Sequence, residues 1–165
     1  MRRDLFNDRV WPDLPRLAPP GAPFLTLRAL EEGRPVELEG LRLTPIAVNH
    51  PVPTVGLLIE EGCTTVVIAT DTGPTAAIWE LAKAQPGLRA VFLDIAFPDA
   101  MASLAELSGH LTPAGFAVEA SKLPVATRLL AIHLKPRHYA EIAAEFAALA
   151  LPNAEICRPG LEYQF

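Results

Sequence analysis

The sequence predicts an α/β protein in which crossover helices join strands of a mixed sheet. Residues 64–70 are an apolar, mostly β-branched run, and residues 75–83 then place apolar side chains at helical spacing, a strand-then-helix pattern that recurs along the chain. The 165 residues are 50% hydrophobic and 20% charged, which excludes a disordered or fibrous chain. A domain of this size buries about 70% of its unfolded surface, so it needs no disulfide or structural metal to fold.

Short strands joined by turns are predicted for the first part of the domain. Apolar residues alternate or cluster at 25–30, 36–38, 41–48 and 55–59, around the turn pairs Glu32-Gly33 and Glu39-Gly40. Five prolines before residue 24 predict an irregular, extended lead-in. We therefore divide the chain into a lead-in, residues 1–24, and a domain, residues 25–165.

The second part of the chain repeats the strand-and-helix pattern. Expected strands cover residues 64–70, 88–95 and 127–134, and expected helices cover residues 75–83 and 139–149. A further helix should begin with Thr112 as N-cap and Pro113 in its first turn. Residues 155–157 and 161–165 are interpreted as a closing strand pair.

Polar side chains follow several of these strands. Strands buried on both faces and joined by helices are expected to be parallel, so that their carboxyl ends share one edge, where α/β sheets bind ligands. His50, Asp71, Asp94 and His133 stand at successive strand ends. Taken singly, His50 could be a loop histidine and Asp71 a turn residue, whereas Asp94 lies in an apolar run and needs a cation or histidine partner. His110 precedes the predicted N-cap, where a structural role is equally open.

Together, imidazoles and carboxylates at one sheet edge are ligands suited to Zn²⁺, Mn²⁺ or Fe²⁺. The sequence has no G-x-G-x-x-G and no G-x-x-x-x-G-K-[ST], which argues against a nucleotide-binding fold. It also has no G-x-S-x-G, which argues against a serine hydrolase. A net charge of −5 argues against general binding of nucleic acid. Two cysteines outside any C-x-x-C pair, and the lack of a long apolar stretch, favour a cytoplasmic protein without a membrane partner.

The segments VNHPVPTVGLLIEEG, VVIATDTGPT, LDIAFPD, SGHLTP and AIHLKPRHY resemble the metallo-β-lactamase superfamily. More narrowly, with LFNDRVWPDL near the start, they resemble the class II 3′,5′-cyclic-nucleotide phosphodiesterases. The resemblance implies a metallo-β-lactamase-like αββα sandwich. The family signature H-x-H-x-D-H is absent from this sequence, so the chain is expected to be the C-terminal half of that fold, either as a fragment, through a truncated gene model, or as a half-protein.

The resemblance also implies roles for individual residues. His50, Asp71 and His133 would be metal ligands, with Asp71 bridging two metals. His110 would be catalytic, ordered by Asp94, although relatives usually carry Glu at the position of Asp94. We further expect Thr72 and Thr112 to contact the substrate.

The implied function is hydrolysis of a cyclic phosphodiester, 3′,5′-cyclic AMP to 5′-AMP, with two divalent metal ions, Zn²⁺ or else Mn²⁺ or Fe²⁺, in the complete protein. This chain alone would hold at most one metal loosely and show weak catalysis or none. One alternative is a non-catalytic half-domain that pairs with a second copy or with a missing N-terminal half. Another is a metallohydrolase acting on an RNA 3′ end or a lactone.

Overall fold

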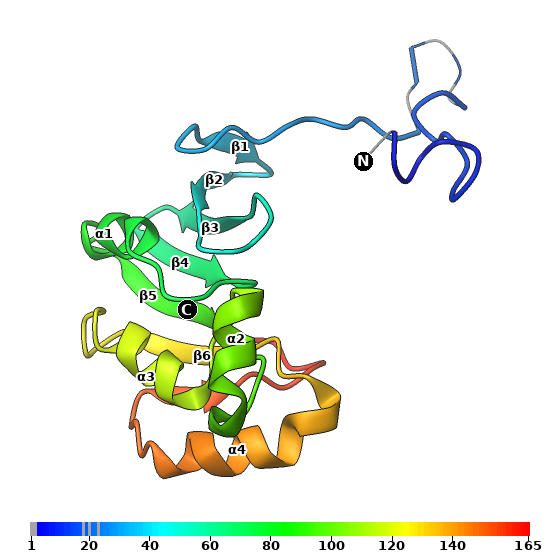
Figure 1. The fold of residues 1–165 in the computed structure, drawn as a ribbon. Helices are drawn as coiled ribbons and strands as arrows, with labels where there is room; N and C mark the ends of the chain where they lie inside the picture. Colours follow the sequence, from blue (N-terminus) through cyan, green and yellow to red (C-terminus); the bar gives the residue numbers. More distant parts are fainter. Residues whose placement is uncertain (1–2, 18, 20, 23) are drawn as a thin grey trace. The chain divides into compact units, whose positions relative to one another are not determined.

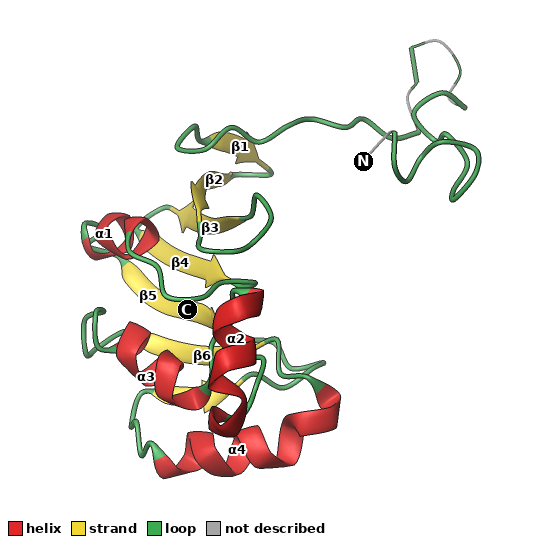
Figure 2. Cartoon of the chain, viewed as in Figure 1, coloured by secondary structure: helices red, strands yellow, loops and turns green. Residues whose placement is uncertain are grey.

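The computed structural model describes residues 3–17, 19, 21–22 and 24–165, and the chain divides into two compact units, Met1–Leu30 and Glu31–Phe165. In the first unit, the described residues form turns and one isolated bridge between Phe6 and Trp11. The strand predicted at residues 25–30 is wrong, because this stretch is drawn as loop in Figure 2. Its side chains Leu27 and Leu30 are exposed, so its apolar pattern does not mark a buried face.

The second unit is built on a seven-stranded mixed sheet in which the strands lie in chain order (Figure 1). The strands are β1 (Val36–Leu38), β2 (Leu41–Ala47), β3 (Val55–Glu61), β4 (Thr64–Ala69), β5 (Leu88–Asp94), β6 (Arg128–Ile132) and β7 (Ala154–Ile156). β1 to β4 pair antiparallel, whereas β4 to β7 pair parallel. The predicted mixed sheet is therefore confirmed.

Helices follow β4, β5 and β6 (Figure 2). They are α1 (Ala77–Lys83), α2 (Ala102–Ser108), α3 (Pro113–Ala120) and α4 (Tyr139–Ala148), with the 3₁₀ turns η1 (Asp99–Met101) and η2 (Pro136–His138). Thr112 caps α3 as predicted, because its Oγ1 accepts a hydrogen bond from the Gly115 amide at 3.3 Å. In the part of the chain that the structure describes, no helix has the length and apolar character to cross a bilayer.

The main hydrophobic core lies between one face of the sheet and the helices α1, α3 and α4. Side chains pointing to this face from the central strands, such as Val67, Val91 and Leu129, belong to one buried cluster with helix residues. The rings of Phe116 in α3 and Phe146 in α4 meet at 5.3 Å within that cluster. This packing fixes the strands whose ends carry the polar residues.

The opposite face of the sheet is only partly covered. The C-terminal tail contributes Tyr163 and Phe165, whose rings lie 6.2 and 6.0 Å from that of Phe92. Residues 161–165 form no strand, so the predicted closing pair is wrong: β7 pairs with β6 instead, and the tail packs through its aromatic rings. Leu43, Ile59 and Val66 form one cross-strand row on this face and remain half-buried.

The strand directions bring the carboxyl ends of β2, β4, β5 and β6, which the polar residues follow, to one edge of the sheet. β2 and β4 are both antiparallel to β3 and therefore run the same way, and β5 and β6 run parallel to β4. The expectation that these strand ends share one edge is confirmed.

Candidate metal centre

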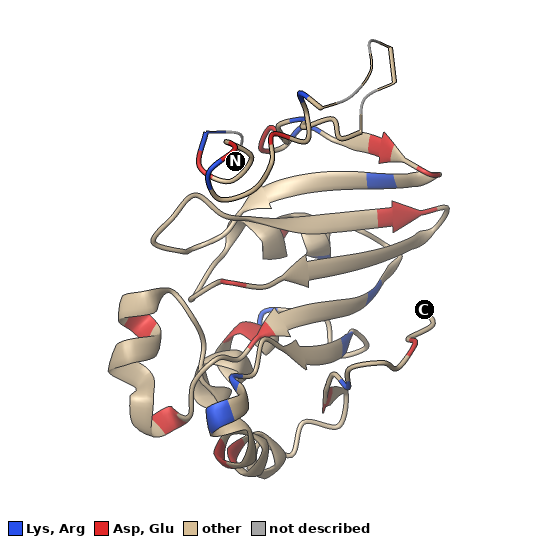
Figure 3. Cartoon of the chain, turned by 90° about the vertical axis from the view of Figure 1, so that its right-hand side faces the viewer, with Lys and Arg blue, Asp and Glu red and all other residues tan. Residues whose placement is uncertain are grey.

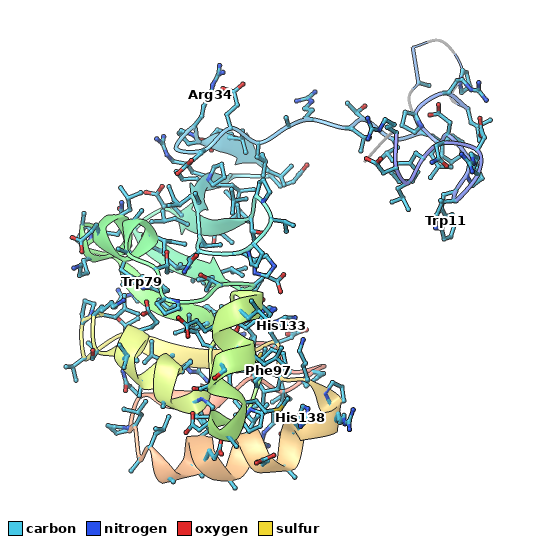
Figure 4. All side chains as sticks on the ribbon, viewed as in Figure 1. Trp11, Arg34, Trp79, Phe97, His133 and His138 are labelled. Carbon is cyan, nitrogen blue, oxygen red and sulfur yellow. The ribbon has the colours of Figure 1, made fainter. Side chains whose placement is uncertain are left out.

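Four titratable side chains meet at this edge. Asp94 is the last residue of β5, Asp71 and His133 follow β4 and β6, and His110 stands between α2 and α3. One ligand atom from each lies within 4.8 Å of those from the other three. Figure 4 shows His133 near Phe97, whose ring lies 6.0 Å from that of His110. Parallel strand ends and one crossover loop thus supply the whole cluster.

Asp94 organises the cluster from beneath. Its side chain is fully buried, and its Oδ1 accepts hydrogen bonds from Nδ1 of His110 at 3.1 Å and Nδ1 of His133 at 2.8 Å. Its Oδ2 accepts a third hydrogen bond, from the Leu111 amide at 2.9 Å. A buried Asp94 was predicted to need a cation or histidine partner, and the structure provides two histidines.

These hydrogen bonds fix the tautomers of both rings. A carboxylate can only accept, so Nδ1 carries the proton in each ring and Nε2 remains available as a ligand atom when the ring is neutral. Nε2 of His133 lies 3.3 Å from Oδ1 of Asp71, toward the outside of the cluster. Carboxylates that hold the inner nitrogen of histidines in this way are typical of metal sites.

The same environment changes the proton affinity of His133. The hydrogen bond that His133 donates to Asp94, supported by the charges of Asp94 and Asp71, raises the pKa of His133 above its usual value, against the opposing effects of burial and Lys135. Without a cation, the two carboxylates therefore favour the protonated form of the ring over the neutral one.

The backbone at two of these residues has an unusual conformation. Asp71 has φ of 51° and His133 has φ of 68°, in the left-handed region that residues other than glycine rarely adopt. Such a conformation costs of order 1–2 kcal/mol per residue. Asp and His are among the residues that tolerate it better, and strained backbone of this kind is concentrated at functional sites.

His50 lies beside the four-residue cluster and outside it. Its Nδ1 donates a hydrogen bond to the Gly109 carbonyl at 3.1 Å, and its ring lies 5.1 Å from that of His110. Gly109 has φ of 68°, and a Cβ there would come within 2.5 Å of Pro51 and 3.0 Å of the His50 Cα. Sequence reasoning missed this glycine, which allows the loop after β2 to approach the end of α2.

The two threonines expected to contact the substrate are both buried, and their hydroxyl groups have partners within the chain. Thr72 donates to the Gly73 carbonyl at 2.8 Å, and Thr112 caps α3. Contact of these hydroxyls with a substrate stays a prediction.

Comparisons with known proteins identify the family. A family model described as the β-lactamase superfamily domain matches residues 3–134. The chain belongs to the β-lactamase superfamily. No curated protein is similar enough to count as a match.

Solved structures in this superfamily share the fold. The metallo-β-lactamase fold protein YhfI from Bacillus subtilis has a TM-score of 0.66 at 18% identity, over 81% of this chain and 54% of its own. Zn²⁺-bound PqqB from Methylobacterium extorquens has a TM-score of 0.63 at 15% identity, over 84% of this chain and 55% of its own. A diphosphatase of the PhnP family has a TM-score of 0.62 at 19% identity, over 82% of this chain and 47% of its own. The chain spans about half the length of these proteins.

A buried network supports the loop that carries Asp71 in this member of the superfamily. Glu119 in α3 is fully buried and accepts hydrogen bonds from Trp79 Nε1 at 2.6 Å, Lys122 Nζ at 2.6 Å and the Thr75 amide at 3.3 Å. Lys122 also donates to the Thr75 carbonyl at 3.0 Å. Sequence reasoning missed this network, since an acidic residue in a predicted helix usually faces solvent.

The residues present fit a divalent cation. Two imidazoles whose inner nitrogens are held by a buried carboxylate, together with the carboxylate of Asp71, form a donor set of the kind that binds Zn²⁺, Mn²⁺ or Fe²⁺. Asp71, His110 and His133 offer ligand atoms on the outer side, whereas Asp94 positions the rings.

Proposed function

We propose that the protein is a metal-dependent hydrolase of a cyclic phosphodiester, converting 3′,5′-cyclic AMP to 5′-AMP. The observation that carries this proposal is the pair of histidines held by one oxygen of Asp94, with a ligand nitrogen of His133 turned toward Asp71. A divalent cation at such a site polarises phosphoryl oxygens and lowers the pKa of a water molecule.

Each residue has a distinct task in this proposal. Asp71 and His133 hold the cation, and His50 holds a second one in the complete protein. Hydrolysis breaks the bond between phosphorus and a ribose oxygen, which must gain a proton as it leaves. In this role Nε2 of His110 supplies that proton and is not a metal ligand, while Asp94 orients the ring through Nδ1.

One observation supports a phosphorus substrate, and a second shows what binding of such a substrate would require. One structural neighbour is a diphosphatase. The chain itself is acidic, with net charge −5, and Figure 3 shows the strands mostly in tan with no dense group of Lys and Arg across them. Positive charge for a phosphoryl group would therefore come mainly from bound cations.

The test begins with metal binding by the chain. Mn²⁺ and Zn²⁺ are titrated by calorimetry into the chain, the D71N variant and the E141Q variant, in which an exposed carboxylate on α4 is neutralised as a control. We expect weak binding of about one cation, loss of binding in D71N, and no change in E141Q. Equal binding by all three proteins would contradict the proposal.

Turnover is then measured with the complete protein on cyclic AMP, a tRNA precursor and a lactone in parallel. We expect hydrolysis of the cyclic nucleotide and its loss in D71N. Hydrolysis of the RNA or the lactone instead would support a metallohydrolase but contradict the proposed cyclic-nucleotide substrate. The chain alone is expected to show weak turnover or none.

A second candidate function is that of a non-catalytic half-domain that pairs with a second copy or with an N-terminal half. The half-buried row of Leu43, Ile59 and Val66 on the less covered sheet face favours it, because a sheet with two apolar faces buries both. Sedimentation of the chain and the intact mass in its native source test this candidate. A monomer that binds metal would argue against it.

A further inference from the structure

An apolar hollow of about 530 Å³ opens beside His133. Its walls come from the end of β6, from η2 and the start of α4, and from β7 with the residues after it. They include Ile132, Leu134, Tyr139, Ile156 and Cys157. This volume is in the range of about 300–1,000 Å³ found for small-molecule sites.

The lining determines what the hollow can hold. Apart from His133, its residues are Ile, Leu, Pro, Tyr and Cys, none of which carries a charge at neutral pH in its ordinary state. An ionic group placed there would lose water without gaining a partner. Tyr139 offers a flat aromatic ring and remains half exposed, and Pro136 and Pro159 add apolar surface.

His133 connects the hollow with the candidate metal centre. His133 is one of the residues that line the hollow, and its Nε2 lies 3.3 Å from Oδ1 of Asp71. A molecule whose anionic group binds a cation held by Asp71 and His133 would therefore have its remaining part next to the hollow.

We propose that this hollow binds the uncharged, ring-bearing part of the substrate while the phosphoryl group lies at Asp71 and His133. The inference rests on the proposed function and adds to it the place where the flat, uncharged part of the phosphoester, such as a nucleoside, binds. It excludes substrates whose second part is itself anionic. Tyr139 is the residue that contacts the ring.

The two cysteines of the chain provide a direct test. Cys157 lines the hollow, and its amide donates to the Ala131 carbonyl at 2.8 Å, which fixes its place beside β6. Cys63 is exposed in the turn between β3 and β4 and is the internal control. The chain is treated with N-ethylmaleimide in the presence of Mn²⁺, chosen because hard cations avoid thiolates, and modification of each cysteine is followed by mass spectrometry.

Three ligands separate the two parts of the site. Adenosine 5′-monophosphate has phosphate and ring, ribose 5-phosphate has no ring, and adenosine has no phosphate. We expect only the nucleotide, at a concentration where it binds, to slow modification of Cys157 at least fivefold, with Cys63 unaffected. Equal rates with nucleotide and ribose 5-phosphate, or equal slowing of both cysteines, would overturn the inference.

Ligand affinity in variants gives a second readout that does not depend on turnover. Y139A should weaken binding of the nucleotide about five- to tenfold, as expected for loss of a stacking partner, and leave that of ribose 5-phosphate unchanged. V125A, which shortens an exposed apolar side chain that does not line the hollow, should change neither. If the chain binds metal and D71N does not, but the nucleotide fails to protect Cys157, only this inference is contradicted. If the chain binds no metal, the proposed function is contradicted.

Discussion

Asp94 and His133 are joined by a hydrogen bond of 2.8 Å between Oδ1 and Nδ1, and the same oxygen also accepts from His110. One buried carboxylate thereby sets the tautomer and the direction of two rings that come from different segments of the chain. The arrangement makes Asp94 a positioning residue, on which both stability and metal affinity should depend.

Replacing Asp94 with Ala should remove the acceptor for three donors at once. The His110 ring and the Leu111 amide are buried, and each would cost about 1–3 kcal/mol without its partner. His133 is exposed and can turn to water, so the free energy of unfolding should fall by several kcal/mol, mainly through the other two donors. D94N keeps one acceptor oxygen and should fold better, yet bind metal about 10- to 100-fold more weakly, as for other partners of metal-binding histidines. Urea unfolding and calorimetry measure the two effects, and unchanged metal affinity in folded D94N would refute this role.

The stability of the metal-free chain should depend on pH through His133. Its pKa is raised in the folded state by Asp94 and Asp71, so the protonated ring stabilises the fold. This contribution is fully present below the unfolded pKa of about 6.5 and is lost as pH rises through the higher folded pKa. Urea unfolding in the presence of a chelator, between about pH 5.5 and 9, should show this decrease in the free energy of unfolding. The H133N variant, chosen because Asn tolerates positive φ, should lack the part of the decrease that comes from His133.

Gly109 should be intolerant of a side chain for two separate reasons. G109A would place a Cβ in a left-handed conformation and within 2.5 Å of Pro51. G62A is the control, because Gly62 has φ of 56° with nothing within 4 Å of the added Cβ. Both variants should lose about 1–2 kcal/mol from the backbone, and G109A about 1–3 kcal/mol more from the contact. Equal losses would show that the loop carrying His50 moves freely.

Two ion pairs with identical spacing should differ in their contribution to stability. Glu119 and Lys122 are separated by three residues in a buried network, with 2.6 Å between Nζ and Oε1, whereas Glu80 and Lys83 have the same spacing at the surface at 2.7 Å. E119Q should cost about 1–3 kcal/mol because it disturbs buried partners, and E80Q less than about 0.5 kcal/mol. Thermal unfolding of both variants would detect this difference.

The sequence was sufficient for the parts of the fold that local patterns determine. The apolar run of β4 and the capping pair Thr112 and Pro113 are local signals, and both elements formed as predicted. α2 was missed, because it is a seven-residue helix whose one buried residue is Ala105. Residues 25–30 and 161–165 have strand-like composition and no partner strand, and composition cannot reveal whether a neighbour exists.

The candidate site was predictable to a similar degree. Strand ends on one edge placed Asp71, Asp94 and His133 together, because parallel pairing follows from buried strands joined by helices. The sharing of one oxygen of Asp94 by two rings depends on side-chain packing across distant segments. The contact of Gly109 with the loop of His50 likewise has no local signal, and the roles of His50, Thr72 and Thr112 stay predictions.

The parallel pairing of β4, β5 and β6 also has a consequence for the order of folding. Residues 71, 94, 110 and 133 come together only when both crossover connections have closed, which are slow, long-range events. The cation site would thus be completed late, after most of the sheet has formed. A cation that binds this site should slow unfolding and leave the refolding rate almost unchanged. The metal would then stabilise the folded sheet without helping it to form.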